Sequence, residues 1–129
     1  MCQLIIGATS ALWESHSRSL RIKGVSTSVR LEIFFWNTLE EIAYRDDMTV
    51  TELITKLYIE STEAKHNLGN FSSFLRVCCG RYHALISVDA IPSELSTKIR
   101  SLQAEKILKQ EQQLQEQKQV KMVKGNTGE

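Results

Sequence analysis

The residues best suited to chemistry lie in segment 26–32, where small polar, basic and aliphatic side chains alternate. In an extended strand, Val29 and Leu31 point to one side. Ser28 and Arg30 then point to the other side, where their hydroxyl and guanidinium groups can donate hydrogen bonds to a polar ligand. A single two-faced strand can neither satisfy its backbone nor bury its apolar side, so the pattern predicts pairing with the same strand of a second copy. Such a ribbon has a basic outer face and fits the major groove of DNA.

The preceding segment, residues 19–23, alternates between apolar and basic side chains. This pattern is typical of a strand with Leu20 and Ile22 facing inward. Gly24 interrupts the alternation, which resumes one residue out of phase. A turn at this glycine would either fold the first strand beside the second or extend the edge of the ribbon, and the pattern leaves both arrangements open.

The charge of the chain is almost balanced but unevenly distributed. Sixteen Lys and Arg residues face 15 Asp and Glu residues in a chain of 129 residues, which is long enough for one domain and a tail. Four bases and two acids precede residue 33, two bases and six acids occupy residues 33–60, and seven bases and five acids follow residue 92. The basic N-terminal region is compatible with a nucleic-acid partner, whereas the small net charge disfavours indiscriminate polyanion binding.

The cysteines and histidines do not form a recognisable site. Three cysteines are an odd number, and Cys78 and Cys79 are adjacent, so we expect reduced thiols and no metal or other cofactor. His83 lies four residues after Cys79, but no third group is placed to orient such a pair. The sequence also lacks a Gly-rich phosphate loop and a serine elbow, and we therefore expect no enzymatic activity.

No apolar run in the sequence approaches the length of a membrane span. The run Leu4–Ala8 is short and has no basic region before it, so it does not resemble a secretory signal. We expect a cytoplasmic protein with no membrane partner.

Three helices are predicted after the strands. The first covers residues 33–45. Thr49 and Glu52 form a capping box at the start of the second helix, which we expect to end near residues 67–69. Asn70 is placed to cap the third helix.

The predicted organisation is an N-terminal segment (1–17) that docks onto a domain (18–85), followed by a partly helical tail (86–129) rich in Gln, Lys and Glu. Pro92 is expected to divide the domain from the tail. Lys106 and Lys109 interrupt the heptad pattern of the tail, which favours a solvated extension with a disordered end over a dimeric coiled coil.

The combined pattern resembles the ribbon-helix-helix superfamily, to which the Arc and methionine repressors belong. It is most similar to a small, uncharacterised bacterial subfamily with an added third helix. The residues that carry this resemblance are 18–22, Gly24, 27–32, Phe35, Trp36, Leu39, Ile42, Ala43 and 70–77, together with the opening residues 1–4.

The resemblance implies a mostly α fold with a short β ribbon, an intertwined homodimer and additional C-terminal helices. It also implies binding of double-stranded DNA, with Arg30 as the strongest candidate for reading bases. The other implied contacts are Ser26 and Ser28 on the ribbon, Thr49 and Thr51 at the start of the second helix, and non-specific attraction from Arg21 and Lys23.

The dimer follows from packing as well as from the resemblance. We expect a folded monomer to leave Leu31, Phe35 and Trp36 in water. One departure from the subfamily is the pair Asp46 and Asp47, where relatives often carry glycine, and these two acids would lie near the approaching phosphates.

Two functions are compatible with these features. The first is a DNA-binding protein, most simply a transcriptional repressor. The second is a dimeric protein-interaction module, antitoxin-like or adaptor-like, whose tail binds a protein partner and which has little or no sequence-specific DNA binding. The acidic outer faces of the first two helices favour the second function.

Overall fold

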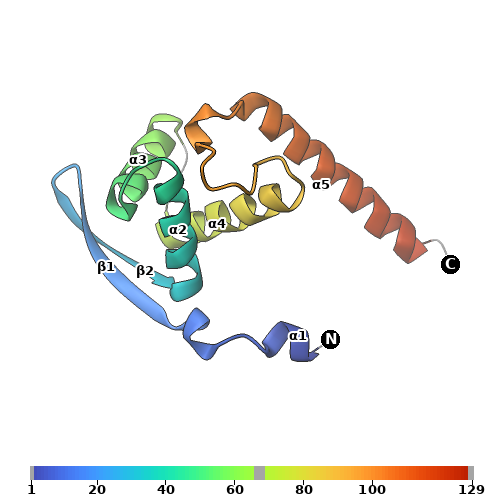
Figure 1. Ribbon diagram of the computed structural model, residues 1–129, viewed down its shortest axis with the longest axis horizontal. Coiled ribbons are helices and arrows are strands. Elements are labelled where there is room, and N and C mark those ends of the chain that lie inside the picture. The colour runs from blue at the N-terminus through green and yellow to red at the C-terminus, as the bar shows by residue number, and fades with distance from the viewer. Residues whose placement is uncertain (1, 66–68, 128–129) are drawn as a thin grey trace.

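The computed structural model describes residues 2–65 and 69–127. A β-hairpin lies across a group of three helices, and a long C-terminal helix extends from the opposite side of the molecule (Figure 1). The elements are α1 (Cys2–Ile6), the 3-10 turn η1 (Ser10–Trp13), β1 (Ser15–Ile22), β2 (Val25–Glu32), α2 (Ile33–Arg45), α3 (Val50–Glu63), α4 (Phe71–Ser87), η2 (Ile99–Ser101) and α5 (Ala104–Thr127).

The two strands form an antiparallel hairpin within one chain. The register pairs Ser15 with Glu32 at the open end and Ile22 with Val25 at the turn. Lys23 and Gly24 connect the strands with φ angles of 50° and 79°, and two consecutive positive φ angles are the signature of a tight hairpin turn. The expectation that β2 pairs with the same strand of a second copy is therefore corrected, because β2 forms its backbone hydrogen bonds with β1 of the same chain.

One face of the hairpin is buried against the helices. Leu20 and Ile22 of β1 are buried, as predicted, together with Val29 and Leu31 of β2. The helices α2 and α4 contact β2, whereas α3 contacts β1. The alternation in the sequence thus identified the correct inner face of each strand.

A single chain buries the residues that were expected to need a dimer. Leu31 is 0 % exposed and Trp36 is 1 % exposed, while Phe35 is partly buried against the same core. The expectation that these side chains would lie in water in a monomer is wrong. The intrachain hairpin and the third helix provide the cover that a second copy was expected to supply.

The helix signals are largely confirmed. Helix α2 has the predicted bounds, Thr49 and Glu52 form the capping box of α3, and Asn70 accepts a hydrogen bond from the amide of Ser73 at the start of α4. Helix α3 ends earlier than predicted, at Glu63, and Lys65 has a positive φ of 63°. The predicted end of the helix falls partly on residues 67 and 68, which lie outside the described residues.

The segment after α4 folds back onto the helices instead of leaving the domain at Pro92. Ile91 is buried in a second apolar cluster with Tyr82 and Leu85, and Ile99 and Leu102 pack against it. The following helix α5 is continuous over Ala104–Thr127, and Arg81 of α4 binds Glu111 of α5 with donor–acceptor distances of 2.6 and 2.8 Å. The predicted division at Pro92 is therefore corrected.

The N-terminal segment is divided between two environments. The turn η1 contacts α2, as expected for a docked segment. The side chains of Leu4, Ile5 and Ile6 in α1 are all exposed. The strand β1 begins at Ser15, within the region that the sequence assigned to this segment.

Candidate nucleic-acid interface

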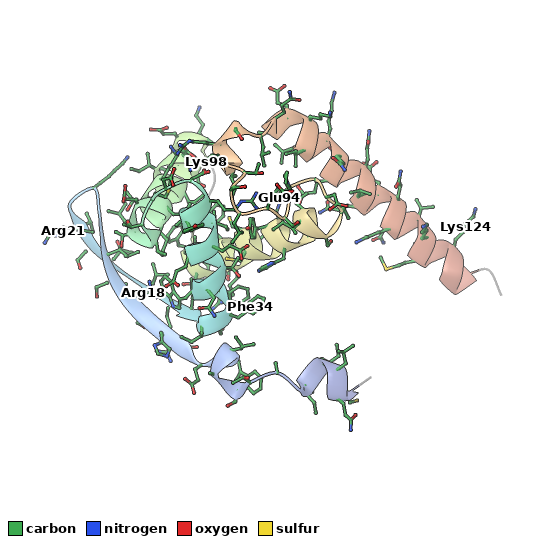
Figure 2. The ribbon with its side chains drawn as sticks, in the orientation of Figure 1. Arg18, Arg21, Phe34, Glu94, Lys98 and Lys124 are labelled. Carbon is green, nitrogen blue, oxygen red and sulfur yellow. The ribbon has the colours of Figure 1, made fainter. Side chains whose placement is uncertain are left out.

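The outer face of the hairpin is a continuous polar surface. Because side chains alternate along each strand and paired residues share a face, four positions of each strand point away from the helices. They are Ser15, Ser17, Ser19 and Arg21 on β1, and Ser26, Ser28, Arg30 and Glu32 on β2. All of them except the partly buried Glu32 are exposed. Figure 2 shows Arg21 directed away from the helical body and Arg18 on the side of α2.

The arginines divide into two groups. Five of the seven in the chain donate hydrogen bonds to protein acceptors, namely Arg18, Arg45, Arg76, Arg81 and Arg100. Arg21 and Arg30 donate none to the described residues. An exposed guanidinium without a protein acceptor keeps its full set of donors for an external ligand. Both of these arginines lie on the outer face of the hairpin.

Arg18 lies on the inner side of the hairpin and fastens it to α2. Its Nη2 donates to Glu40 Oε1 at 3.1 Å, and its guanidinium lies 4.4 Å from the centre of the Trp36 ring. The Trp36 Nε1 in turn donates to the backbone carbonyl of His16 at 3.0 Å. These contacts hold the hairpin against the helices, and its outer face is turned away from them.

The acidic residue at the end of the outer face is held by a partner. Arg76 Nε donates to Glu32 Oε1 at 2.9 Å, and this hydrogen bond lowers the pKa of the carboxyl below its ordinary value of 4.5. The charge of Arg30 acts in the same direction. The carboxylate would repel a phosphate, and its contact with α4 reduces that repulsion next to Arg30.

The predicted contacts at the start of α3 lie on a separate element. The Thr49 hydroxyl accepts from the Glu52 amide at 3.1 Å, and Glu52 Oε1 accepts from the Thr49 amide at 3.2 Å. Both groups of the cap are therefore engaged within the chain. The amides of Val50 and Thr51, in the first turn of the helix, are the ones left to meet an anion.

The structure thus brings four of the predicted residues together, Arg21, Ser26, Ser28 and Arg30, on one face. Lys23 is exposed at the tip of the hairpin. Sequence reasoning missed Ser17 and Ser19, which share this face. The alternation of residues 19–23 could have placed Ser19 on this face, whereas the wholly polar run at residues 14–19 has no alternation that would have placed Ser17.

The two acids after α2 have partners within the chain. Asp47 forms ion pairs with Lys98 and, at 3.8 Å, with Arg100. Asp46 accepts from the backbone amide of Ile99 at 2.7 Å. The Lys98 contact lowers the pKa of Asp47. Both acids therefore have partners within the chain, and their position relative to approaching phosphates stays a prediction.

The described residues contain no cluster of side chains suited to a metal ion. Cys79 Sγ contacts the carbonyl of Phe35 at 3.8 Å, and burial raises the pKa of this thiol to about 12. His83 contacts the hydroxyl of Thr38 at 2.8 Å, so the thiol and the imidazole have different partners. A thiol with so high a pKa carries almost no thiolate at neutral pH.

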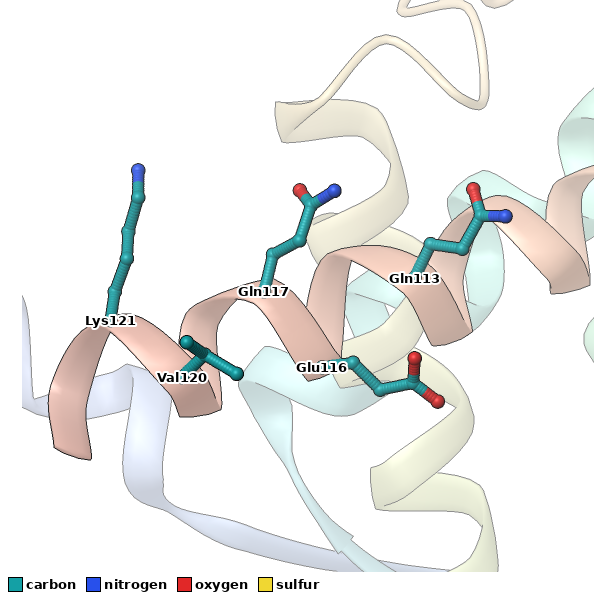
Figure 3. Close-up of a pocket in the computed structure, with 5 residues that line it drawn as sticks. All are labelled: Gln113, Glu116, Gln117, Val120 and Lys121. Carbon is teal, nitrogen blue, oxygen red and sulfur yellow. The ribbon is translucent and has the colours of Figure 1, made fainter. Parts of the chain in front are cut away.

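A surface hollow of about 420 Å³ lies along α5 (Figure 3). Its lining residues, Gln113, Glu116, Gln117, Val120 and Lys121, all come from one face of this single helix. Enclosed ligand sites need walls from several elements, so this hollow does not define a substrate pocket. Over residues 2–65 and 69–127, the helices are too short or too polar to cross a membrane.

The ribbon, the following helices and their capping signals define the class of protein. Residues 15–83 match the family model described as a ribbon-helix-helix domain, and the chain belongs to this family. Its members are in general non-enzymatic DNA-binding regulators that bind as dimers. The resemblance inferred from the sequence is thereby confirmed.

A solved structure of similar fold is that of an uncharacterized protein from Bordetella pertussis Tohama I. It shares 49% sequence identity with this chain at a TM-score of 0.80. The match covers 84% of this chain and 86% of that protein. Among curated proteins, none matches the sequence.

Proposed function

We propose that this protein binds double-stranded DNA through the outer face of its hairpin and acts as a transcriptional repressor. The observation that carries the proposal is the pair Arg21 and Arg30, which are exposed on the outer face of the hairpin and have no protein acceptor among the described residues. The other five arginines are used within the fold. A ribbon of two strands is about the right width for the major groove, which is roughly 12 Å wide.

The ribbon residues differ in how strongly they could discriminate between DNA bases. Arg30 can donate two hydrogen bonds to the acceptor edge of a guanine, and such a contact discriminates against other bases by about 1–3 kcal/mol. Ser26 and Ser28 can donate or accept and therefore discriminate less. Lys23 at the hairpin tip and the free amides near Thr51 suit backbone phosphates, which give affinity without sequence preference.

We further propose that the protein acts as a homodimer in which each copy contributes a complete hairpin. The general behaviour of the family supports the dimer. Because one chain already buries Leu31 and Trp36, dimerisation is not needed to complete this core. A sedimentation mass of one chain at micromolar concentration, with and without DNA, would remove the dimer from the proposal.

The DNA proposal is tested with genomic fragments at low salt. Wild-type protein is expected to enrich a subset of fragments, whereas Arg30→Ala is expected to lose the preference for the guanine that Arg30 contacts. Lys23→Asn removes one charge and keeps a residue that tolerates a positive φ. It is expected to lower affinity evenly for all fragments and to reduce the dependence on salt. Failure of the wild type to retain any fragment at low salt would reject DNA binding.

The alternative, a protein-interaction module, is favoured by one observation on α5. Leu108, Val120, Met122 and Val123 are exposed along this helix. A truncation after Lys118 removes three of them and keeps Ile107 and Glu111, which attach the helix to the rest of the fold. Capture of a specific protein by the full chain and not by the truncated chain, combined with no DNA binding, would favour this function.

A further inference from the structure

The two strands of the hairpin carry the same order of residue types. In β1 the order is Ser17, Arg18, Ser19, Leu20, Arg21, Ile22, and in β2 it is Ser26, Thr27, Ser28, Val29, Arg30, Leu31. Each strand therefore has serine at the first and third positions, an aliphatic residue at the fourth and sixth, and arginine at the fifth. The second copy of this pattern begins nine residues after the first.

The strand register converts this repeat into two-fold symmetry. Ser19 lies opposite Ser28 at the centre. On one side of this pair Arg21 lies opposite Ser26, and on the other side Ser17 lies opposite Arg30. A half-turn about an axis through the Ser19–Ser28 pair therefore exchanges the two strands and places serine on serine and arginine on arginine.

The buried face obeys the same symmetry. The half-turn exchanges Leu20 with Val29 and Ile22 with Leu31, and all four side chains are buried. The symmetry is broken at the position between the two serines, where Arg18 is exchanged with Thr27. Arg18 is held by Glu40 and Trp36, so this difference attaches the hairpin to α2. The outer face is symmetric over residues 17–21 and 26–30, and the symmetry ends at Glu32, which the half-turn exchanges with Lys23.

We propose that one chain carries a complete two-fold DNA-reading ribbon, with Arg21 and Arg30 as equivalent base readers. This inference rests on the proposed DNA binding and extends it, because it assigns Arg21 a role in specificity beyond general attraction. The recognised element is an inverted repeat, since the axis that exchanges the two arginines also exchanges the two strands of a DNA duplex. Each arginine then reads a guanine on a different DNA strand.

The strand spacing gives the length of this element. Arg21 lies opposite Ser26, four residues before Arg30, so the two arginines are separated by about 14 Å along the ribbon and about 5 Å across it. Base pairs are stacked at intervals of about 3.4 Å. The two guanines are therefore expected about four base-pair steps apart, and the serines of the central pair face the bases between them.

The test is selection from random duplex DNA with four proteins: wild type, Arg21→Ala, Arg30→Ala and the double variant. All substituted side chains are exposed, so the fold is expected to be retained. The wild type is expected to select an inverted pair of guanines. Each single variant is expected to keep one guanine position and lose the other, and the double variant is expected to keep neither.

Lys23→Asn is the matched control, because it removes one positive charge from the same hairpin without removing a proposed reader. On the selected duplex, each arginine variant is expected to bind about 5- to 140-fold more weakly than wild type. The control is expected to lose affinity equally on selected and unselected duplexes.

The outcomes separate this inference from the proposed function. If Arg30→Ala alone erases both guanine positions, or Arg21→Ala leaves both intact, the single-chain ribbon is overturned while DNA binding stands. Such a result would mean that the reading ribbon combines strands from two copies. If the wild type selects nothing and binds no duplex at low salt, the proposed function fails as well.

Discussion

The hairpin and the turn after α2 contain similar charged residues and place them in opposite environments. Around the turn, Arg45 is 1 % exposed and donates to Tyr82 Oη and to the backbone carbonyls of Pro92, Glu94 and Thr97. On the hairpin, Arg21 and Arg30 are exposed and donate to no described acceptor. Arginine thus stabilises the fold in one region and remains available in the other.

In this chain with almost no net charge, the charges bound within the fold can be told from those that remain available to a ligand by their partners and their exposure. Asp46 and Asp47 are acids in a region that could face phosphates, but Lys98, Arg100 and the Ile99 amide bind them. A buried or paired charge contributes little to the field outside the protein. The basic character of the hairpin is therefore larger than the total charge suggests.

The largest expected difference between the two regions is in the stability effect of replacing their arginines. We expect Arg45→Met to lower the free energy of unfolding by about 3 kcal/mol, because the Tyr82 hydroxyl and three backbone carbonyls lose the donor that the buried guanidinium supplies. Arg21→Met is the control and is expected to change stability by less than about 0.5 kcal/mol. Urea unfolding measures both. Equal effects of the two substitutions would contradict the assignment of separate roles.

The second prediction concerns two exposed arginines, Arg30 without a protein acceptor on β2 and Arg100 with one on η2. Arg30→Ala is expected to weaken specific DNA binding by about 1–3 kcal/mol. Arg100→Ala is expected to leave it unchanged, because the Arg100 side chain already contacts Asp47 and the carbonyl of Asp46. Fluorescence anisotropy with a selected duplex checks both values. A comparable loss for Arg100→Ala would place the DNA across the turn.

The third prediction separates the two threonines at the start of α3. Thr49→Ala removes the side-chain acceptor of the capping box and is expected to cost about 1 kcal/mol of stability. Thr51→Ala is expected to cost much less, because its exposed side chain makes no described hydrogen bond. Thermal or urea unfolding checks the difference. Equal stability of the two variants would show that the cap contributes nothing.

The smallest expected effect is the pH dependence of the contact between α4 and α5. The hydrogen bond from Arg81 lowers the pKa of Glu111 below its ordinary value of 4.5. A carboxyl whose folded pKa is lowered stabilises the fold above its unfolded pKa, and this contribution is lost as the pH falls through the folded value.

Wild-type protein is therefore expected to lose up to about 1 kcal/mol of stability as the pH falls from about 5 to about 3 through this pair. Glu111→Gln should lack that part of the pH dependence while remaining folded. Urea midpoints of the two proteins across this range provide the measurement. Parallel pH profiles would show that the ion pair does not contribute.

Much of the local structure could be predicted because local rules govern it. The inner faces of both strands follow from alternation, and the bounds of α2 follow from its apolar stripe. The caps at Thr49 and Asn70 depend on side chains within three residues of the helix start. The outer-face residues Ser26, Ser28 and Arg30 were placed correctly for the same reason.

The errors concern partners that are distant in the sequence. Alternation tells which side of a strand is apolar, but it does not identify the strand that pairs with it. This is why β2 was assigned to a second copy. An arginine at the end of an amphipathic helix is typical of an exposed residue, so the burial of Arg45 by a segment about 50 residues later could not be foreseen.

The sequence alone determined the elements of this protein, the apolar face of each element and its membership of a DNA-binding family, because these depend on residue type and short-range spacing. Only the tertiary structure decided that one chain completes the ribbon and which arginines remain free. Backbone pairing and the burial of charge depend on long-range contacts, in which each donor competes for the acceptors that folding brings near.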